Sequence, residues 1–121
     1  MKRAKARGTD RAQQHLDAAW QHFHSGQDNE VLMSCHKAFE YLAKKQHMAS
    51  PDQNAFEKIL SSASPDVRKH LKMLLHHLCQ AHHLGRHEPG GETPCVGHAE
   101  AEFLLVTSQA ALAYLASRWA V

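Results

Sequence analysis

The residues of this chain best suited to acid–base chemistry are the adjacent Arg86 and His87. A guanidinium is permanently charged and can hold a phosphate in two places, while an imidazole transfers protons near neutral pH. Metal-free RNA cleavage requires this combination: imidazoles move the protons of the attacking and leaving oxygens, and Arg86 stabilises the charge on phosphorus. RNA binding without cleavage requires only the arginine. Without either role, Arg86 and His87 would be surface-turn residues, with Glu88 as an ion-pair partner.

Histidine is abundant, with twelve residues among 121. Most of the twelve are expected on solvated faces or helix edges, where they need no catalytic explanation. Four of them flank the Gly85–Arg86 pair and the long break that follows it: His82, His83, His87 and His98. We therefore predict a catalytic site made of Arg86, His87 and His98, with His83 as a substrate-binding residue.

A second pattern of histidine and cysteine suggests metal binding instead. On a helical wheel, His76, Cys79 and His83 share one face, opposite Val67, Leu71, Leu74 and Leu78, and are therefore expected to face outward. With a fourth ligand such as His87 or Cys95, this face could hold zinc, which imidazole and thiolate suit. Because no CxxC or HExxH spacing is present, a solvated polar face is the alternative, and we assign no metal ligands and no cofactor.

The N-terminal residues are strongly basic. Lys2, Arg3, Lys5, Arg7 and Arg11 against Asp10 give the first eleven residues a charge of +4, which leaves −2 for the rest of a chain whose formal net charge is +2. We predict a flexible basic arm over residues 1–9, in which Lys2 and Arg3 could contact phosphates of nucleic acid. The alternative is a solvated tail without a ligand.

Helical periodicity runs through almost the whole sequence. Helices are expected from Thr9 or Asp10 to Gly26, from Asp28 or Asn29 to about Gln46, from Pro51 to about Ser61, from Pro65 to about Gly85, and from His98 to Trp119. Gly26 suits a left-handed helix end, while Ser50 and Ser64 precede prolines as capping residues. Prolines and glycines between Arg86 and Gly97 break the pattern.

These elements predict an all-α, up-and-down four-helix bundle with one short extra helix, forming a single domain over residues 10–121. The last helix is apolar nearly all round, which indicates burial on several sides. We expect a homodimer that covers this helix, or else a monomer in which it is central.

Three segments resemble the HEPN superfamily of small all-helical domains. CHKAFEYLAKK, from Cys35 to Lys45, is similar to its second helix; HLGRHE, from His83 to Glu88, is similar to its loop; and HAEAEFLLVTSQAALAYLA, from His98 to Ala116, is similar to its final helix. The resemblance covers most of residues 10–118. It implies a ribonuclease or RNA-binding protein of a defence or toxin–antitoxin system, a cleft formed by two copies, and an antitoxin or nucleotidyltransferase-type partner.

The catalytic signature of that family is matched in its first half only. Arg86 followed by His87 fits, but the family has a second histidine four to six residues after the arginine, whereas here eleven residues separate Arg86 from His98. Either the loop carries an insertion and His98 still reaches the cleft, or catalysis is lost and a non-catalytic dimerisation or nucleotide-binding module remains.

Other classes of protein are disfavoured by the sequence. No apolar run is long enough to span a membrane, and no apolar stretch follows the N-terminal charges as in a secretory signal. Cys35, Cys79 and Cys95 form no CxxC pair and leave an odd thiol, which favours reduced cysteines. We therefore expect a cytoplasmic protein without membrane contacts.

Overall fold

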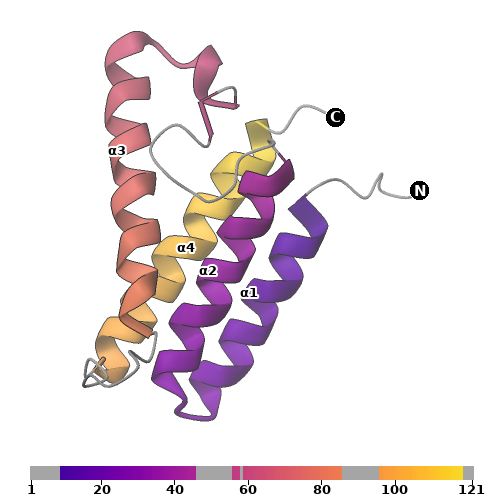
Figure 1. The fold of residues 1–121 in the computed structure, drawn as a ribbon, viewed down its shortest axis with the longest axis vertical. Helices are drawn as coiled ribbons and strands as arrows, with labels where there is room; N and C mark the ends of the chain where they lie inside the picture. Colours follow the sequence, from indigo (N-terminus) through magenta and orange to yellow (C-terminus); the bar gives the residue numbers. More distant parts are fainter. Residues whose placement is uncertain (1–8, 46–55, 58, 86–95, 119–121) are drawn as a thin grey trace.

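Four α-helices form the fold, connected as an up-and-down bundle (Figure 1). The computed structural model describes residues 9–45, 56–57, 59–85 and 96–118. The helices are α1 (Thr9–His24), α2 (Asp28–Lys45), α3 (Pro65–His82) and α4 (His98–Arg118), with 3-10 turns η1 (Ile59–Ser62) and η2 (His83–Gly85). The predicted all-α class and four-helix bundle are confirmed. Within the described ranges, no helix is long and apolar enough to cross a membrane.

The turn between α1 and α2 follows from one glycine. Gly26 has a φ of 75°, the left-handed conformation that a side chain disfavours. Its N–H donates to the Phe23 carbonyl at 3.0 Å, and the Gln27 N–H donates to the His22 carbonyl at 2.9 Å. These two bonds satisfy the last carbonyls of α1 in a Schellman arrangement and reverse the chain.

The core is centred on α2, which contacts all three other helices. Among the described residues α1 and α3 do not touch, so α2 and α4 separate them. The buried residues of α2 therefore cover about half of its circumference: Val31, Leu32, Ser34, Cys35, Ala38, Phe39, Leu42 and Ala43. A reciprocal pair of side-chain amides joins α1 to α4. Gln13 donates to Gln109 at 3.1 Å, and Gln109 donates to Gln13 at 2.7 Å.

The short extra helix predicted from Pro51 to about Ser61 differs from the structure in the part that is described. The structure has a 3-10 turn at Ile59–Ser62 where the sequence predicts the end of an α-helix, and residues 50–55 lie outside the described ranges. Ile59 and Leu60 are buried in the core, so this turn covers the end of the bundle. Ser64 stands at the N-cap of α3 but makes no side-chain capping bond, contrary to its predicted role.

The buried faces of α3 and α4 also differ from expectation. On α3 the buried residues are Leu75, Leu78, Cys79 and His82, while Val67 and Leu74 are half exposed. On α4 one stripe is buried, consisting of Ala101, Leu105, Ser108, Leu112 and Leu115. The prediction of burial on several sides of α4 is therefore wrong for the single chain, because no described element covers its outer face.

Replacing Gly26 by alanine is expected to lower the free energy of unfolding by about 1–2 kcal/mol, because a Cβ disfavours the left-handed backbone. No heavy atom lies within 4 Å of the position that a Cβ would take, so the cost is conformational and not steric. Chemical denaturation of both proteins measures the difference.

Gly26→Asn is the matched control, since asparagine tolerates the left-handed conformation better than alanine does. It should lose clearly less stability than Gly26→Ala. Equal losses in the two variants would contradict the conformational explanation.

Candidate functional site

Of the six predicted site residues, two lie within the described ranges. Arg86 and His87, and Lys2 and Arg3 of the predicted basic arm, lie outside them. His83 belongs to η2 and His98 is the first residue of α4. In sequence, these two elements border the segment that contains Arg86 and His87.

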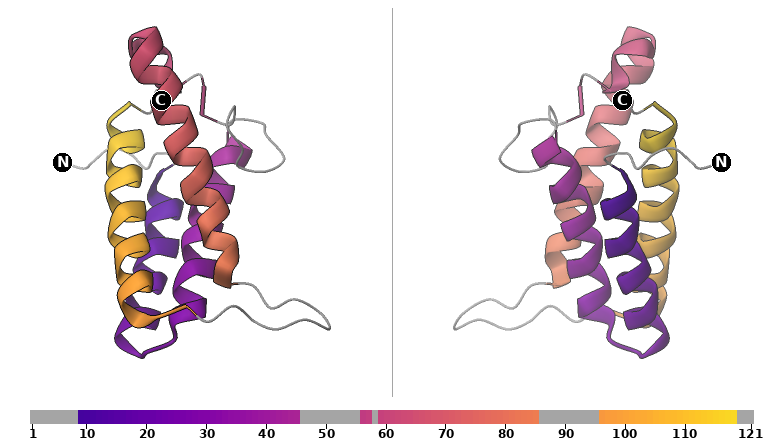
Figure 2. Two further views of the ribbon diagram at one scale, coloured as in Figure 1. Left: turned by 90° about the vertical axis from the view of Figure 1, so that its left-hand side faces the viewer. Right: turned by 90° about the vertical axis from the view of Figure 1, so that its right-hand side faces the viewer.

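His98 is held by contacts with both helices of the first hairpin. Its Nδ1 lies 2.7 Å from Oδ1 of Asp28, the first residue of α2, and its ring stacks on Phe23 of α1 with centroids 4.1 Å apart and planes at 4°. The start of α4 and the α1–α2 turn lie at the same end of the bundle (Figure 2), which brings these residues together. The side chain of His98 is nevertheless 55% exposed.

This geometry has a chemical consequence for the imidazole. When Nδ1–H donates to the Asp28 carboxylate, the neutral ring carries its lone pair on Nε2. A carboxylate that orients a histidine in this way also stabilises the imidazolium that forms when the ring takes a proton. The Asp28–His98 pair thus has the orientation and the solvent access that a general base requires.

His83 belongs to a different group, the imidazole cluster, which consists of His36, His82 and His83. The His36 ring centroid lies 4.5 Å from that of His83 and 6.1 Å from that of His82. His82 is fully buried at the end of α3, and its Nε2 lies 2.8 Å from Oγ of Ser108 on α4. The cluster thus joins α2, α3 and α4 at one level of the bundle.

Burial keeps His82 neutral. Desolvation is the main cause that lowers its pKa to about 3, and the charges of His36 and His83 lower it further. Ser108 also contacts the buried Cys35; this hydrogen bond lowers the thiol's pKa, but desolvation dominates and raises it to about 12. Both groups are therefore uncharged at neutral pH, as a buried site without a counter-charge requires.

A small pocket of about 120 Å³ opens beside the cluster between α2 and α3, and it is lined by Met33, His36, Lys37, Glu40 and His82. The Nδ1 atom of His82 is buried without a hydrogen-bond partner in the structure. Water within such a pocket would satisfy this atom, since the volume is ample for one molecule.

The structure gives His98 and His83 different neighbours. His98 contacts Asp28, whereas His83 packs on His36, eight residues further along α2. At the rise of an α-helix, these two positions on α2 are about 12 Å apart. The two described members of the predicted site are therefore anchored at different levels of the same helix.

The prediction that His76, Cys79 and His83 share an outward face is wrong for Cys79. Cys79 is 2% exposed and packs in the core, where burial raises the pKa of its thiol to about 12. The wheel placed the core on the side of Val67 and Leu74, but α3 packs through the side that carries Cys79. Throughout the described ranges, no three His, Cys, Asp or Glu side chains are grouped to hold a metal ion. His87 and Cys95 lie outside those ranges.

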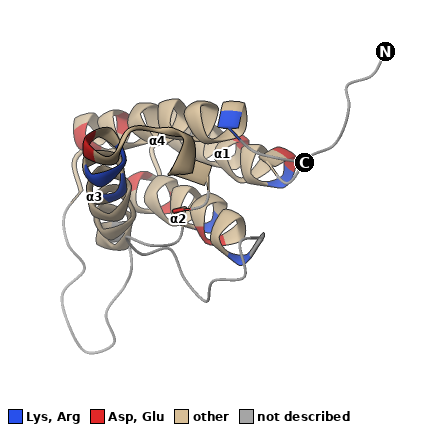
Figure 3. Ribbon diagram, turned by 90° about the horizontal axis from the view of Figure 1, so that it is seen from above, with Lys and Arg blue, Asp and Glu red and all other residues tan. Residues whose placement is uncertain are grey.

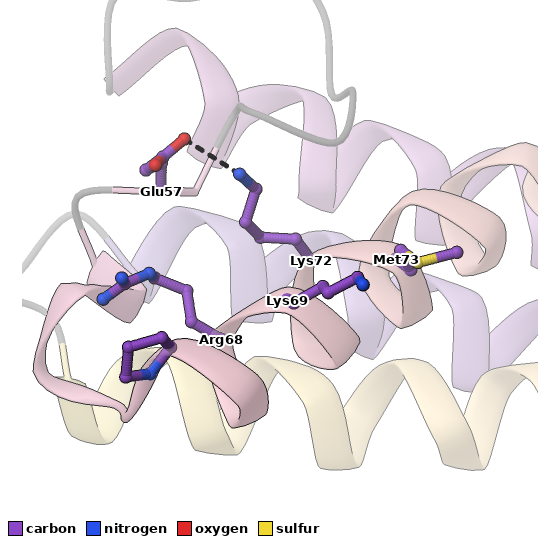
Figure 4. Close-up of a pocket in the computed structure, with 6 residues that line it drawn as sticks. Glu57, Arg68, Lys69, Lys72 and Met73 are labelled. Atoms are coloured by element: carbon purple, nitrogen blue, oxygen red, sulfur yellow. Dashed lines mark hydrogen bonds and ion pairs between the residues drawn. The ribbon is translucent and has the colours of Figure 1, made fainter.

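A larger, basic pocket lies near the start of α3 (Figure 4), with a volume of about 360 Å³. Two of its cations already have partners within the chain. Lys72 pairs with Glu57 at 3.1 Å, and Arg68 donates to the carbonyls of Ser61 and Ala63, both at 3.2 Å. Lys69 also lines the pocket. Because α3 is about 27 Å long, this pocket is remote from the imidazole cluster at the other end of the helix.

Sequence reasoning missed Asp28, Phe23, His36 and Ser108. Asp28 was interpreted as a helix start, which it is, and nothing in the local pattern links it to His98, seventy residues later. Comparisons with protein-family models, with curated proteins and with solved structures find no match for this chain.

His82→Gln is expected to make the protein less sensitive to mild acid. The pKa of His82 is near 3 when folded and about 6.5 when exposed, so between these values the unfolded state binds more protons. Stability from this residue is therefore complete above about pH 6.5 and is lost as the pH falls, by about 1–2 kcal/mol between pH 7 and pH 5. Urea denaturation at both pH values measures this loss.

His77→Gln is the matched control, because His77 is exposed on the same helix. It should retain the acid sensitivity of the unmodified protein. An unchanged difference between the two pH values in His82→Gln would show that His82 is not the group that couples folding to protonation.

Proposed function

We propose that this chain is a HEPN-like domain that binds RNA and cleaves it without a metal ion. His98 acts as the general base that takes the proton of a 2′-hydroxyl, Arg86 holds the phosphate, and His87 protonates the leaving oxygen. The attacking oxygen forms a new bond to phosphorus as the 5′-oxygen leaves, which produces a cyclic phosphate and a free hydroxyl.

The observation that carries this proposal is the Asp28–His98 pair. It sets a carboxylate 2.7 Å from Nδ1 of a half-exposed imidazole, which is the arrangement that a general base uses.

Arg86 and the basic N-terminal arm would complete the RNA site. Arg86 follows η2 directly in the sequence, and η2 contains His83, an exposed member of the imidazole cluster. Lys2 and Arg3 would add contacts to phosphates without base specificity. The resemblance that suggests this activity also suggests an antitoxin or nucleotidyltransferase-type partner and a role in defence in the cytoplasm.

The competing function is a non-catalytic HEPN-like module that binds a nucleotide or a protein partner. One observation favours it: the stack of His98 on Phe23 ties α4 to the α1–α2 hairpin, which is a sufficient structural role. Under this alternative, substitution of His98 would change stability and leave no activity to lose.

Purified protein is expected to cleave single-stranded RNA in the presence of a chelator, and His98→Asn should reduce the rate by about 100-fold or more. Asparagine can still donate to Asp28 but cannot transfer a proton. Arg86→Ala should reduce cleavage to a similar degree, since it removes the phosphate ligand. Rates on a labelled RNA, with melting temperatures for each variant, test these roles.

Asp28→Asn separates orientation from packing, because it keeps the size of the side chain but favours the other histidine tautomer. It should slow cleavage by about tenfold or more and shift the pH–rate profile. His70→Ala, at an exposed position on α3, is the matched control and should cleave normally. No cleavage by the unmodified protein, or full activity in His98→Asn, would refute the catalytic proposal.

A further inference from the structure

The outer face of α4 carries a continuous stripe of uncharged side chains, which we call the α4 outer stripe. Its members recur at alternating intervals of four and three residues, and all six are exposed: Ala99, Phe103, Val106, Ala110, Ala113 and Ser117. Phe103 is 69% and Val106 is 49% exposed. This interval is the heptad spacing by which one helix packs along another.

The stripe lies opposite the buried one, so no element within the described ranges of the chain covers it. Ala101, Leu105 and Ser108 point into the bundle, and at 100° per residue the outer stripe is centred about 160° away from them. An exposed phenylalanine next to an exposed valine on a regular helix is typical of an interaction surface.

Side-chain size indicates what covers this surface. The large members, Phe103 and Val106, lie in the N-terminal half of α4, and the small members Ala110, Ala113 and Ser117 lie in the C-terminal half. If a second copy of α4 runs antiparallel about a two-fold axis level with Ser108, Phe103 faces Ala113 of the second copy and Val106 faces its Ala110. Each large residue then meets a small one, whereas parallel helices would oppose Phe103 to Phe103.

The distribution of charge along α4 also favours antiparallel packing of two copies. Glu100 and Glu102 lie near the start of α4 and Arg118 is its last residue, with no charged residue between them (Figure 3). Arg118 stands 5.5 Å from the ring of Tyr114, at the side of the stripe. Antiparallel helices place the acidic end of one copy beside the basic end of the other, and they also oppose their helix dipoles favourably. Parallel helices would place like charges together.

We propose that the α4 outer stripe is a homodimer interface in which two copies of α4 pair antiparallel, with Phe103 of each seated against Ala113 of the other. The two His98 residues would then lie at opposite ends of the helix pair, roughly 30 Å apart. This interface is therefore not the two-copy cleft that the HEPN resemblance implies, and it does not depend on the proposed ribonuclease activity.

The state of assembly is tested first, by sedimentation of the full chain over a range of concentrations. The unmodified protein should be a dimer, and Phe103→Ala should raise the dissociation constant by about tenfold or more while leaving the circular dichroism unchanged. Leu74→Ala is the matched control, since Leu74 is also a large exposed apolar residue, 58% exposed on α3. A monomer throughout, or a dimer weakened only by Leu74→Ala, would overturn the proposal.

Disulfide trapping then tests orientation, in a background with Cys95 replaced by serine; Cys35 and Cys79 stay, because their buried thiols do not react readily. A mixture of Phe103→Cys and Ala113→Cys chains, one of them carrying a mass tag, should form a mixed disulfide dimer. Neither variant alone should cross-link efficiently. Cross-linking of Phe103→Cys to itself would show parallel helices and refute the antiparallel register. Cleavage assays on the same variants report separately on the ribonuclease.

Discussion

The contact of α2 with every other helix is the constraint on which the rest of this structure depends. Because α2 is buried over about half of its circumference and contacts α1, α3 and α4, it fixes where its own polar residues can stand. Asp28, at its first turn, meets His98 of α4, and His36, two turns later, meets His82 and His83 at the end of α3. A single helix thus positions both groups of histidines, and a shift of α2 along its axis would disturb both.

Much of the fold could be predicted from local signals. Gly26 ends α1 and Pro65 begins α3 because each imposes a backbone geometry of its own, whatever packs against it. The buried faces were harder to predict, because apolar residues alone do not reveal which side of a helix finds a partner. Val67 and Leu74 look like core residues but are half exposed, while the polar His82 is fully buried because Ser108 gives it a hydrogen bond.

For the candidate site, too, some features could be predicted from the sequence and others could not. Residue type and neighbourhood were enough to single out Arg86, His87, His83 and His98, since imidazoles beside a guanidinium suggest phosphate chemistry in any fold. The partners of these histidines were not predictable, because they depend on how helices distant in sequence are placed. Asp28 reaches His98 only because the start of α4 packs against the α1–α2 turn, and no spacing within the sequence encodes that contact.

The uneven attachment of α3 has a consequence for motion. Its C-terminal half is anchored by Leu75, Leu78, Cys79 and His82, whereas Val67 and Met73 of its N-terminal half, and Leu74 at its middle, are exposed. Because α3 does not touch α1, it can detach while the other three helices remain packed, in a partial opening that costs less than complete unfolding. Such an opening would uncover the Cys79 thiol, which is shielded in the closed bundle. The rate at which Cys79 reacts with a small alkylating reagent would therefore report how often α3 detaches from the other helices.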